Sequence, residues 1–124
     1  MLTDFTMYPT LPAVDLARAR RFYEEKLGFK PGEVTSAGVT YHVNNSSIFL
    51  YPSTFAGSNK ATAAGFNVTN LEGLVAELRG KGVVFEEYDM GDFKTVNGIL
   101  KTPEGLAAWF KDTEGNIIGL ISGM

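Results

Sequence analysis

The sequence of 124 residues contains no cysteine and a single histidine, His42. The absence of cysteine excludes disulfides, thiolate metal ligands and cysteine nucleophiles. With one histidine, neither a three-histidine zinc site nor a two-histidine-one-carboxylate iron site can form within one chain. The sequence therefore offers few of the side chains that hold a catalytic transition metal.

Long apolar runs and an excess of positive charge are also missing. No apolar stretch approaches the roughly 18 residues of a membrane-spanning helix, and residues 1–5 lack the basic head and apolar run of a signal peptide. The net charge is −3, with lysines and arginines scattered among the acids. We expect a cytoplasmic protein that contacts neither nucleic acid nor membrane. A hydrophobic content of 44% suits a single domain spanning 1–124.

An internal repeat divides this domain into two halves. In each half a short strand runs into a capping residue, a helix follows, and a glycine ends the helix. Asp15 and Asn70 are the expected N-caps, because their side chains can accept hydrogen bonds from N–H groups of the first turn. Gly28 and Gly82 suit the left-handed position after a helix. Two helices of about three turns each are predicted.

Each predicted helix has an apolar stripe and a charged remainder. The stripes are Leu16, Ala19, Tyr23 and Leu27 in the first helix, and Leu71, Leu74, Val75 and Leu78 in the second. We interpret the charged residues as solvated faces. They are Arg18, Arg21, Glu24, Glu25, Glu72, Glu77, Arg79 and Lys81.

Three β-like segments follow each helix. In the first half they are residues 31–36, 39–43 and 47–51, and in the second half 83–88, 99–101 together with 106–111, and 117–121. Residues 53–60 have the composition of a linker. The sequence thus predicts an α+β domain made of two βαβββ modules, module one at about 1–55 and module two at about 61–124.

The strings LPAVDLARARRFYEEKLGF and AAWFKDTEGNIIGL resemble the opening and closing patterns of the glyoxalase/bleomycin-resistance/extradiol-dioxygenase (vicinal oxygen chelate) superfamily. Thr113 stands where the closing pattern usually has proline. The resemblance implies curled mixed sheets around a cavity, with the helices on the convex side and two modules facing each other. In this superfamily a second chain often completes the cavity.

The superfamily is best known for binding a divalent metal through four positions on the first and fourth strands of the modules. Transferred to this sequence, these positions fall at Tyr8, Tyr51, Ala63 and Gly119. Alanine and glycine offer no ligand atom, and a neutral phenol is a poor ligand. The resemblance therefore implies that the metal site is lost, and no metal or other cofactor is expected.

The candidate ligand-binding set has two parts. It contains strand residues whose alternation places them on the same face as the transferred metal positions, and aromatic residues expected nearby. This set is Tyr8, Thr10, Tyr51, Asn67, Trp109 and Phe93. For Tyr8 and Tyr51 two interpretations stay open, because they either plug the lost metal site or contact a ligand. The loop at 86–93 is either a solvated connection or a lid whose carboxylates attract a cation.

His42 is the candidate catalytic residue, as a general base if a carboxylate lies beside it. The alternative for this histidine is a structural or exposed residue. The sequence does not supply the neighbour that would decide between the two.

Two functions fit these observations. The first is a metal-independent binding protein for a small apolar or cationic molecule, a drug or a metabolite, similar to the bleomycin-resistance branch. The second is an enzyme, either a metal-dependent lyase or dioxygenase with non-standard ligands, or a metal-free isomerase or cyclase-like catalyst. A dimerisation or regulatory module with a filled cavity is a third alternative. A homodimer is expected, because half-sheets of this size leave open edges.

Overall fold

The computed structural model describes residues 1–123, and the structural statements below concern these residues. The first module begins with β1 (Thr10–Ala13) and α1 (Leu16–Arg21), which continues into a π-helical turn at Phe22–Lys26. Its remaining strands are β2 (Pro31–Thr35), β3 (Gly38–Val43) and β4 (Ser46–Pro52).

The second module repeats this order with one addition. It contains β5 (Thr62–Asn67) and α2 (Leu71–Gly80), followed by the short hairpin of β6 (Asp89–Met90) and β7 (Phe93–Lys94). Three longer strands complete it, namely β8 (Ile99–Lys101), β9 (Leu106–Lys111) and β10 (Ile117–Ser122).

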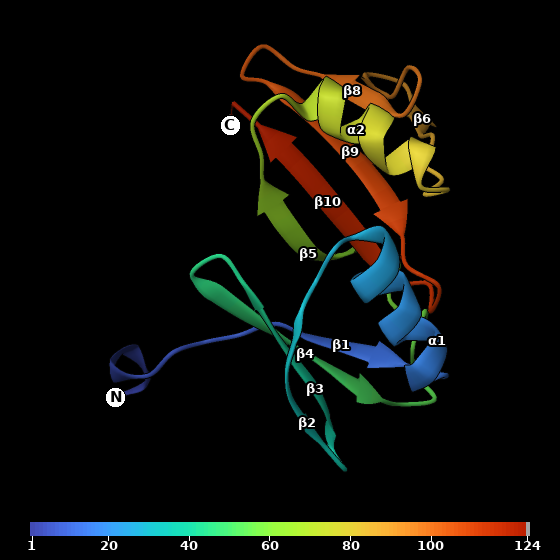
Figure 1. Ribbon diagram of the computed structural model, residues 1–124. Helices are drawn as coiled ribbons and strands as arrows, with labels where there is room; N and C mark the ends of the chain where they lie inside the picture. The colour runs from blue at the N-terminus through green and yellow to red at the C-terminus, as the bar shows by residue number, and fades with distance from the viewer. Residues whose placement is uncertain (124) are drawn as a thin grey trace.

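The two main sheets have the same topology (Figure 1). Their strand orders are β1-β4-β3-β2 and β5-β10-β9-β8, and in each the first strand runs parallel to its neighbour while the other pairs are antiparallel. The expected α+β fold of two βαβββ modules is confirmed.

The helix boundaries follow the predicted capping chemistry. The Asp15 side chain accepts a hydrogen bond from the backbone N–H of Arg18, and the Asn70 side chain accepts one from Gly73. Gly28 and Gly82 have φ angles of +76° and +90°, the left-handed conformation that glycine adopts without steric cost. The caps and terminators predicted from the sequence are therefore those of the structure.

The helix-facing sides of both sheets share one hydrophobic core. The largest fully buried side chains come from both modules and are Tyr23, Tyr41, Phe110, Leu11, Leu50, Leu71, Ile118, Val39 and Val75. Aromatic contacts cross between the modules, because the ring centroids of Phe22 and Phe110 are 6.2 Å apart, as are those of Phe29 and Phe66. Within one chain, the modules thus meet through their helix-facing sides.

Three local expectations need correction. Residues 83–88 form no regular strand; Phe85 makes an isolated bridge to Phe110, and the Glu86 N–H donates to the Trp109 carbonyl. The segment 86–93 instead leads into the β6–β7 hairpin. Arg18 and Glu24 are not simply solvated, since each bonds a side chain from elsewhere in the fold.

The N-terminal arm, residues 1–9, extends away from the rest of the chain (Figure 1). Several of its large apolar side chains face solvent, with Met7 93% exposed and Phe5 73% exposed. Exposed apolar side chains clustered in one segment are typical of a surface that meets another molecule.

Among residues 1–123, no helix is both long and apolar enough to cross a membrane.

Candidate functional site

A hollow of about 390 Å³ lies on the second module. Because side chains alternate along a strand, Trp109 and Ile117 point away from the core that their neighbours Phe110 and Ile118 fill. We call this space the aromatic hollow. It is lined by Lys60, Ala61, Thr62, Tyr88, Met90, Phe93, Trp109 and Ile117.

Three half-buried aromatic rings contact one another in this hollow. The Trp109 ring centroid lies 5.4 Å from that of Phe93 and 5.7 Å from that of Tyr88, and the Tyr88 and Phe93 centroids are 6.2 Å apart. The ring planes cross at 41°, 73° and 53°, so the rings meet at an angle and are not stacked flat. Such an arrangement presents both ring faces and ring edges to a ligand.

The position of the indole depends on Gly119 in the neighbouring strand. A Cβ atom at residue 119 would lie 3.2 Å from the Trp109 Nε1 and 3.3 Å from the Thr62 methyl carbon. These distances are tighter than ordinary packing contacts, so the Trp109 ring lies over a backbone that carries no side chain. Glycine at 119 makes room for the indole.

Hydrogen bonds around Thr95 hold the β6–β7 hairpin against the module. The Tyr88 N–H donates to the Thr95 hydroxyl oxygen at 2.8 Å, and the Thr95 N–H donates to the Tyr88 carbonyl at 2.9 Å. The Glu87 carboxylate accepts from the Thr95 hydroxyl and from the Gly98 N–H. Tyr88 and Phe93 are therefore positioned by a hairpin with defined anchors, and not by a free loop.

The acidic residues of this segment are partly neutralised. Lys111 Nζ lies 3.4 Å from Glu86 Oε1, and Lys94 Nζ lies 3.9 Å from Asp89 Oδ2. Both pairs are solvent-exposed to a large degree and contribute little to stability. Their relevance is electrostatic, since they reduce the negative charge that the loop was expected to present.

A second hollow, of about 310 Å³, lies on the first module and is lined by Tyr8, Thr40, Ser47, Ile48 and Phe49. We call it the first-module hollow. It shares no lining residue with the aromatic hollow. These two hollows lie on different modules, whereas a third hollow, described next, is lined by residues of both modules.

The candidate ligand-binding residues are distributed over both modules. Trp109 and Phe93 line the aromatic hollow, and Tyr8, 53% exposed, lines the first-module hollow. Asn67 lines a third hollow of about 400 Å³, beside the β3–β4 hairpin. The structure therefore brings together two of the six.

Thr10 and Tyr51 lie near Phe49. Thr10 is the strand partner of Phe49, and the Tyr51 ring stacks on the Phe49 ring at 6.1 Å and 5°. In this register Tyr8 precedes Thr10 by two residues and Tyr51 follows Phe49 by two. Tyr51 is paired with Pro12 and Tyr8 lies before the first residue of β1, so the two tyrosines are not strand partners.

The four positions to which the resemblance transfers metal ligands do not fit a metal ion. Gly119 is the strand partner of Gly65, and the methyl carbon of Thr62, rather than Ala63, lies beside it; the β5–β10 register shifts between Ile117 and Ile118. Ala63 packs against the hydrophobic core instead. Within residues 1–123, no three histidine, aspartate or glutamate side chains converge on a point that could hold an ion.

His42 lies on β3 and is exposed. Its Nδ1 is 3.1 Å from the Ser47 hydroxyl oxygen, and its ring covers Gly32, where a Cβ atom would come within 2.8 Å of the imidazole. Among the described residues no carboxylate bonds this histidine. The side chain that contacts this imidazole is a serine hydroxyl, and not the carboxylate expected beside a general base.

A buried polar network, which the sequence reasoning missed, joins the modules. The Tyr23 hydroxyl donates to Asp112 Oδ2 at 2.5 Å, and Asn116 Nδ2 donates to the same oxygen at 2.8 Å. Burial, followed by the nearby Asp112 charge, raises the pKa of Tyr23 far above its usual value. The concentration of Asp, Glu and Asn in the 112–116 turn was the available signal, but its partners lie about 90 residues away.

Arg18 and Glu114 form the second part of this network. Arg18 Nε donates to Glu114 Oε2 at 2.8 Å, and the Asp15 N–H donates to Glu114 Oε1 at 2.9 Å. Burial by itself would raise the pKa of the Glu114 carboxyl, but hydrogen bonds from Arg18, Asp15 and Thr113 outweigh it and lower this pKa to about 2. The network holds α1 to the closing turn of module two.

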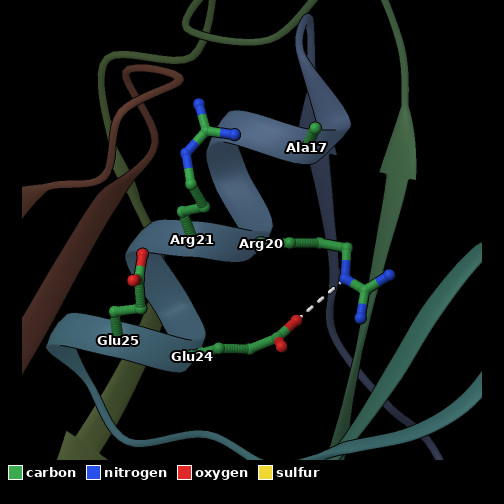
Figure 2. A pocket seen from close by; sticks show the side chains of 5 residues that line it. All are labelled: Ala17, Arg20, Arg21, Glu24 and Glu25. Carbon is green, nitrogen blue, oxygen red and sulfur yellow. Dashed lines mark hydrogen bonds and ion pairs between the residues drawn. The ribbon is translucent and has the colours of Figure 1, made fainter.

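A shallow hollow on the surface of the first helix contains only helix residues, as Figure 2 shows. Arg20 and Glu24 point toward each other, with 2.8 Å between Nε and Oε2, while Arg21 and Glu25 lie on the other side of the turn. Glu24 also accepts a hydrogen bond from the buried Tyr41 at 2.7 Å. The charges of Arg20 and Glu24 are satisfied within the fold, so we assign this pair a structural role.

The comparisons with known proteins agree with this architecture. The family described as the Glyoxalase/Bleomycin resistance protein/Dioxygenase superfamily matches residues 6–120. No curated protein sequence matches the chain.

Several solved structures share the fold. UcmS2 is 21% identical, with a TM-score of 0.72 over 94% of this chain and 98% of its own. The lactoylglutathione lyase of Agrobacterium tumefaciens is 14% identical, with a TM-score of 0.72 over 96% and 93%. The fosfomycin resistance protein FosX of Listeria monocytogenes, solved with Mn(II) and sulfate, is 14% identical, with a TM-score of 0.71 over 97% and 90%.

At these identities the structural likeness concerns the fold alone. The family match covers nearly the whole chain, and the repeated topology of the two modules agrees with it. This chain belongs to the glyoxalase/bleomycin resistance protein/dioxygenase superfamily.

Proposed function

We propose that this protein binds a largely apolar small molecule in the aromatic hollow, without the help of a metal ion. The observation that carries this proposal is the placement of the Trp109 indole over Gly119. At Gly119, where the resemblance places a metal ligand, the Trp109 ring covers the backbone instead. The aromatic hollow therefore lies beside a position that the resemblance assigns to the metal site, but it has the chemistry of an apolar binding site.

The size and lining of the hollow support this function. Its volume of about 390 Å³ falls within the range typical of small-molecule sites. Three aromatic rings can bury a planar molecule, and each Å² of apolar surface removed from water contributes roughly 25 cal/mol before the cost of association. The ligand proposed is therefore small, flat and mostly apolar.

We propose further that the binding form is a homodimer. The aromatic hollow and the first-module hollow share no residue within one chain, and β1 and β5 are edge strands. A second copy could cover both edges and place its first-module hollow against the aromatic hollow. The exposed side chains of Met7 and Tyr8 lie next to the surface that such a partner would cover.

The side chains of this protein favour binding over catalysis. One similar structure is a lyase and another is a fosfomycin resistance protein, so this fold occurs both in enzymes and in resistance proteins. In this chain His42 lacks a carboxylate partner among the described residues, and no metal-binding cluster forms within them. No observation specific to this chain supports the enzymatic alternative.

A ligand titration monitored by tryptophan emission tests the proposal, since Trp109 is the only tryptophan. A panel of planar aromatic antibiotics and metabolites should change the emission for at least one compound. Phe93→Ala should weaken that binding, whereas Phe55→Ala, a matched change at an exposed linker residue, should not. Native mass spectrometry of protein purified without added ligand would identify any molecule already bound.

A cavity closed by side chains of the second copy, with no response to any compound, would contradict the proposal. It would favour the alternative of a dimerisation module.

A further inference from the structure

The polar groups of the aromatic hollow restrict the chemistry of its ligand. Four lining side chains carry a polar hydrogen, namely Lys60, Thr62, Tyr88 and Trp109, and no lining residue is a carboxylate. The indole N–H and the ammonium group can only donate hydrogen bonds. A ligand that satisfies this lining must therefore supply acceptors.

These four side chains are free to contact a ligand. Among residues 1–123, none of them makes a side-chain hydrogen bond or ion pair. Burial, followed by the charge of Glu86, raises the pKa of the Tyr88 phenol, so this group stays protonated and remains a donor near neutral pH. The Trp109 Nε1 and the methyl carbon of Thr62 both lie close to Gly119.

The charge of the lining favours an anionic group. Lys60 is the charged residue of the hollow, while the nearby Glu86 and Asp89 face Lys111 and Lys94. A cationic ligand would meet an unpaired ammonium group with no lining carboxylate to balance it. An anionic ligand would instead form a charge-assisted hydrogen bond with Lys60.

We infer that the aromatic hollow takes a planar aromatic carboxylate, whose ring lies against Tyr88, Phe93 and Trp109 and whose carboxylate oxygens accept from Lys60 and the Trp109 N–H. This inference rests on the proposed function and specifies the ligand class of the same site. The aromatic part supplies the apolar contact, and the carboxylate supplies the acceptors that the indole N–H and the ammonium group require.

Isothermal titration with three naphthalenes of one shape tests the inference. The probes are 2-naphthoate, the neutral 2-naphthamide and the cationic 2-naphthamidinium, whose substituents are all planar. A charge-assisted hydrogen bond predicts that wild type binds the carboxylate about tenfold tighter than the amide, and the cation more weakly than either. Lys60→Gln should remove this preference without affecting the amide, and Lys60→Arg should retain it.

Lys101→Gln is the matched control, because it removes one positive charge from exposed β8, outside the hollow. It should leave the preference for the carboxylate intact. Equal affinity for the three probes, or tightest binding of the cation, would overturn the inference while leaving the proposed function standing. Absence of binding by all three to folded wild type would overturn the inference and count against the proposed function as well.

Discussion

The hydroxyl of Tyr23 and the carboxylate of Asp112 meet at 2.5 Å, although 89 residues separate them in the sequence. Tyr23 lies in the helical turn of module one, and Asp112 begins the last turn of module two. Their hydrogen bond is buried and connects the two modules across the shared core.

Removing this hydroxyl should destabilise the fold. Tyr23→Phe leaves Asp112 Oδ2 with the Asn116 amide as its remaining side-chain donor, and a lost hydrogen bond to a buried charged group costs about 1–3 kcal/mol. Urea unfolding measures the free energy of unfolding. Tyr41→Phe is the matched control, and we expect a smaller loss, because Glu24 keeps its bond to Arg20 and is partly solvated. A larger loss in the control would contradict the role assigned to Tyr23.

Glu114 should make stability decrease in acid. Its pKa is lowered from 4.5 in the unfolded chain to about 2 in the fold, so the stabilisation is present above pH 4.5 and is lost as pH falls toward 2. The loss should be about 2 kcal/mol, reduced because half-exposed Arg18 is screened by solvent. Unfolding free energies of wild type and Glu114→Gln, measured from pH 7 to 2.5, should converge. A constant difference over this range would show that Glu114 is not the titrating group.

A side chain at residue 119 should displace the indole of Trp109. Gly119→Glu restores a carboxylate at the transferred metal position but forces the ring from its contacts, at a cost of about 1–3 kcal/mol typical of overpacking. Tryptophan emission should shift to longer wavelength as the ring becomes more exposed, and ligand binding should be lost. Gly80→Ala is the control, because a Cβ atom there meets nothing within 4 Å, and its emission should match wild type. Identical emission in Gly119→Glu would refute the packing described.

The purified protein should contain no stoichiometric Ni, Zn, Fe, Mn or Mg. The reason is the donor set, since Ala63 and Gly119 offer no ligand atom and the neutral phenols of Tyr8 and Tyr51 are poor ligands. Elemental analysis after mild chelation measures this content. About one metal ion per chain would revive the lyase or dioxygenase alternative.

Sedimentation equilibrium should give about twice the chain mass of 13.5 kDa. Met7→Glu, in the exposed arm, should weaken the dimer, because burying an unpaired carboxylate in an interface is costly. Val84→Glu makes the same change at another exposed position, on the segment after α2, and should leave the dimer intact. A monomer at all concentrations would count against the dimer and against a cavity completed by a second copy.

Much of the local structure could be predicted from the sequence, because its signals act over short distances. Asp15 and Asn70 cap their helices through N–H groups three residues away, and Gly28 and Gly82 adopt conformations set by their own missing side chains. The repeat of these signals indicated two modules of one topology. The segment 83–88 was mistaken for a strand, because it makes only one bridge to β9, whose strand partner on that edge is β8, and then leads into the separate β6–β7 hairpin.

The site could be predicted only in part. Trp109 and Phe93 were predicted to bind a ligand, and the structure brings them together in one hollow, while their binding role stays a prediction. The distance between Tyr8 and Tyr51 depends on the β1–β4 register, and the place of Ala63 depends on a shift in the β5–β10 register. A shift of one residue changes which side chains share a face, and no local pattern in the sequence reports it.

The sequence by itself thus determined the two capped helices and the two-module plan of this protein, because residue types at short spacing specify both. Only the tertiary structure decided which faces of the modules meet. It joined Tyr23 to Asp112 and Arg18 to Glu114, and it laid Trp109 over Gly119. These contacts link residues far apart in the chain, and their geometry arises from the packing of whole sheets, so it exists only once the modules are folded against each other.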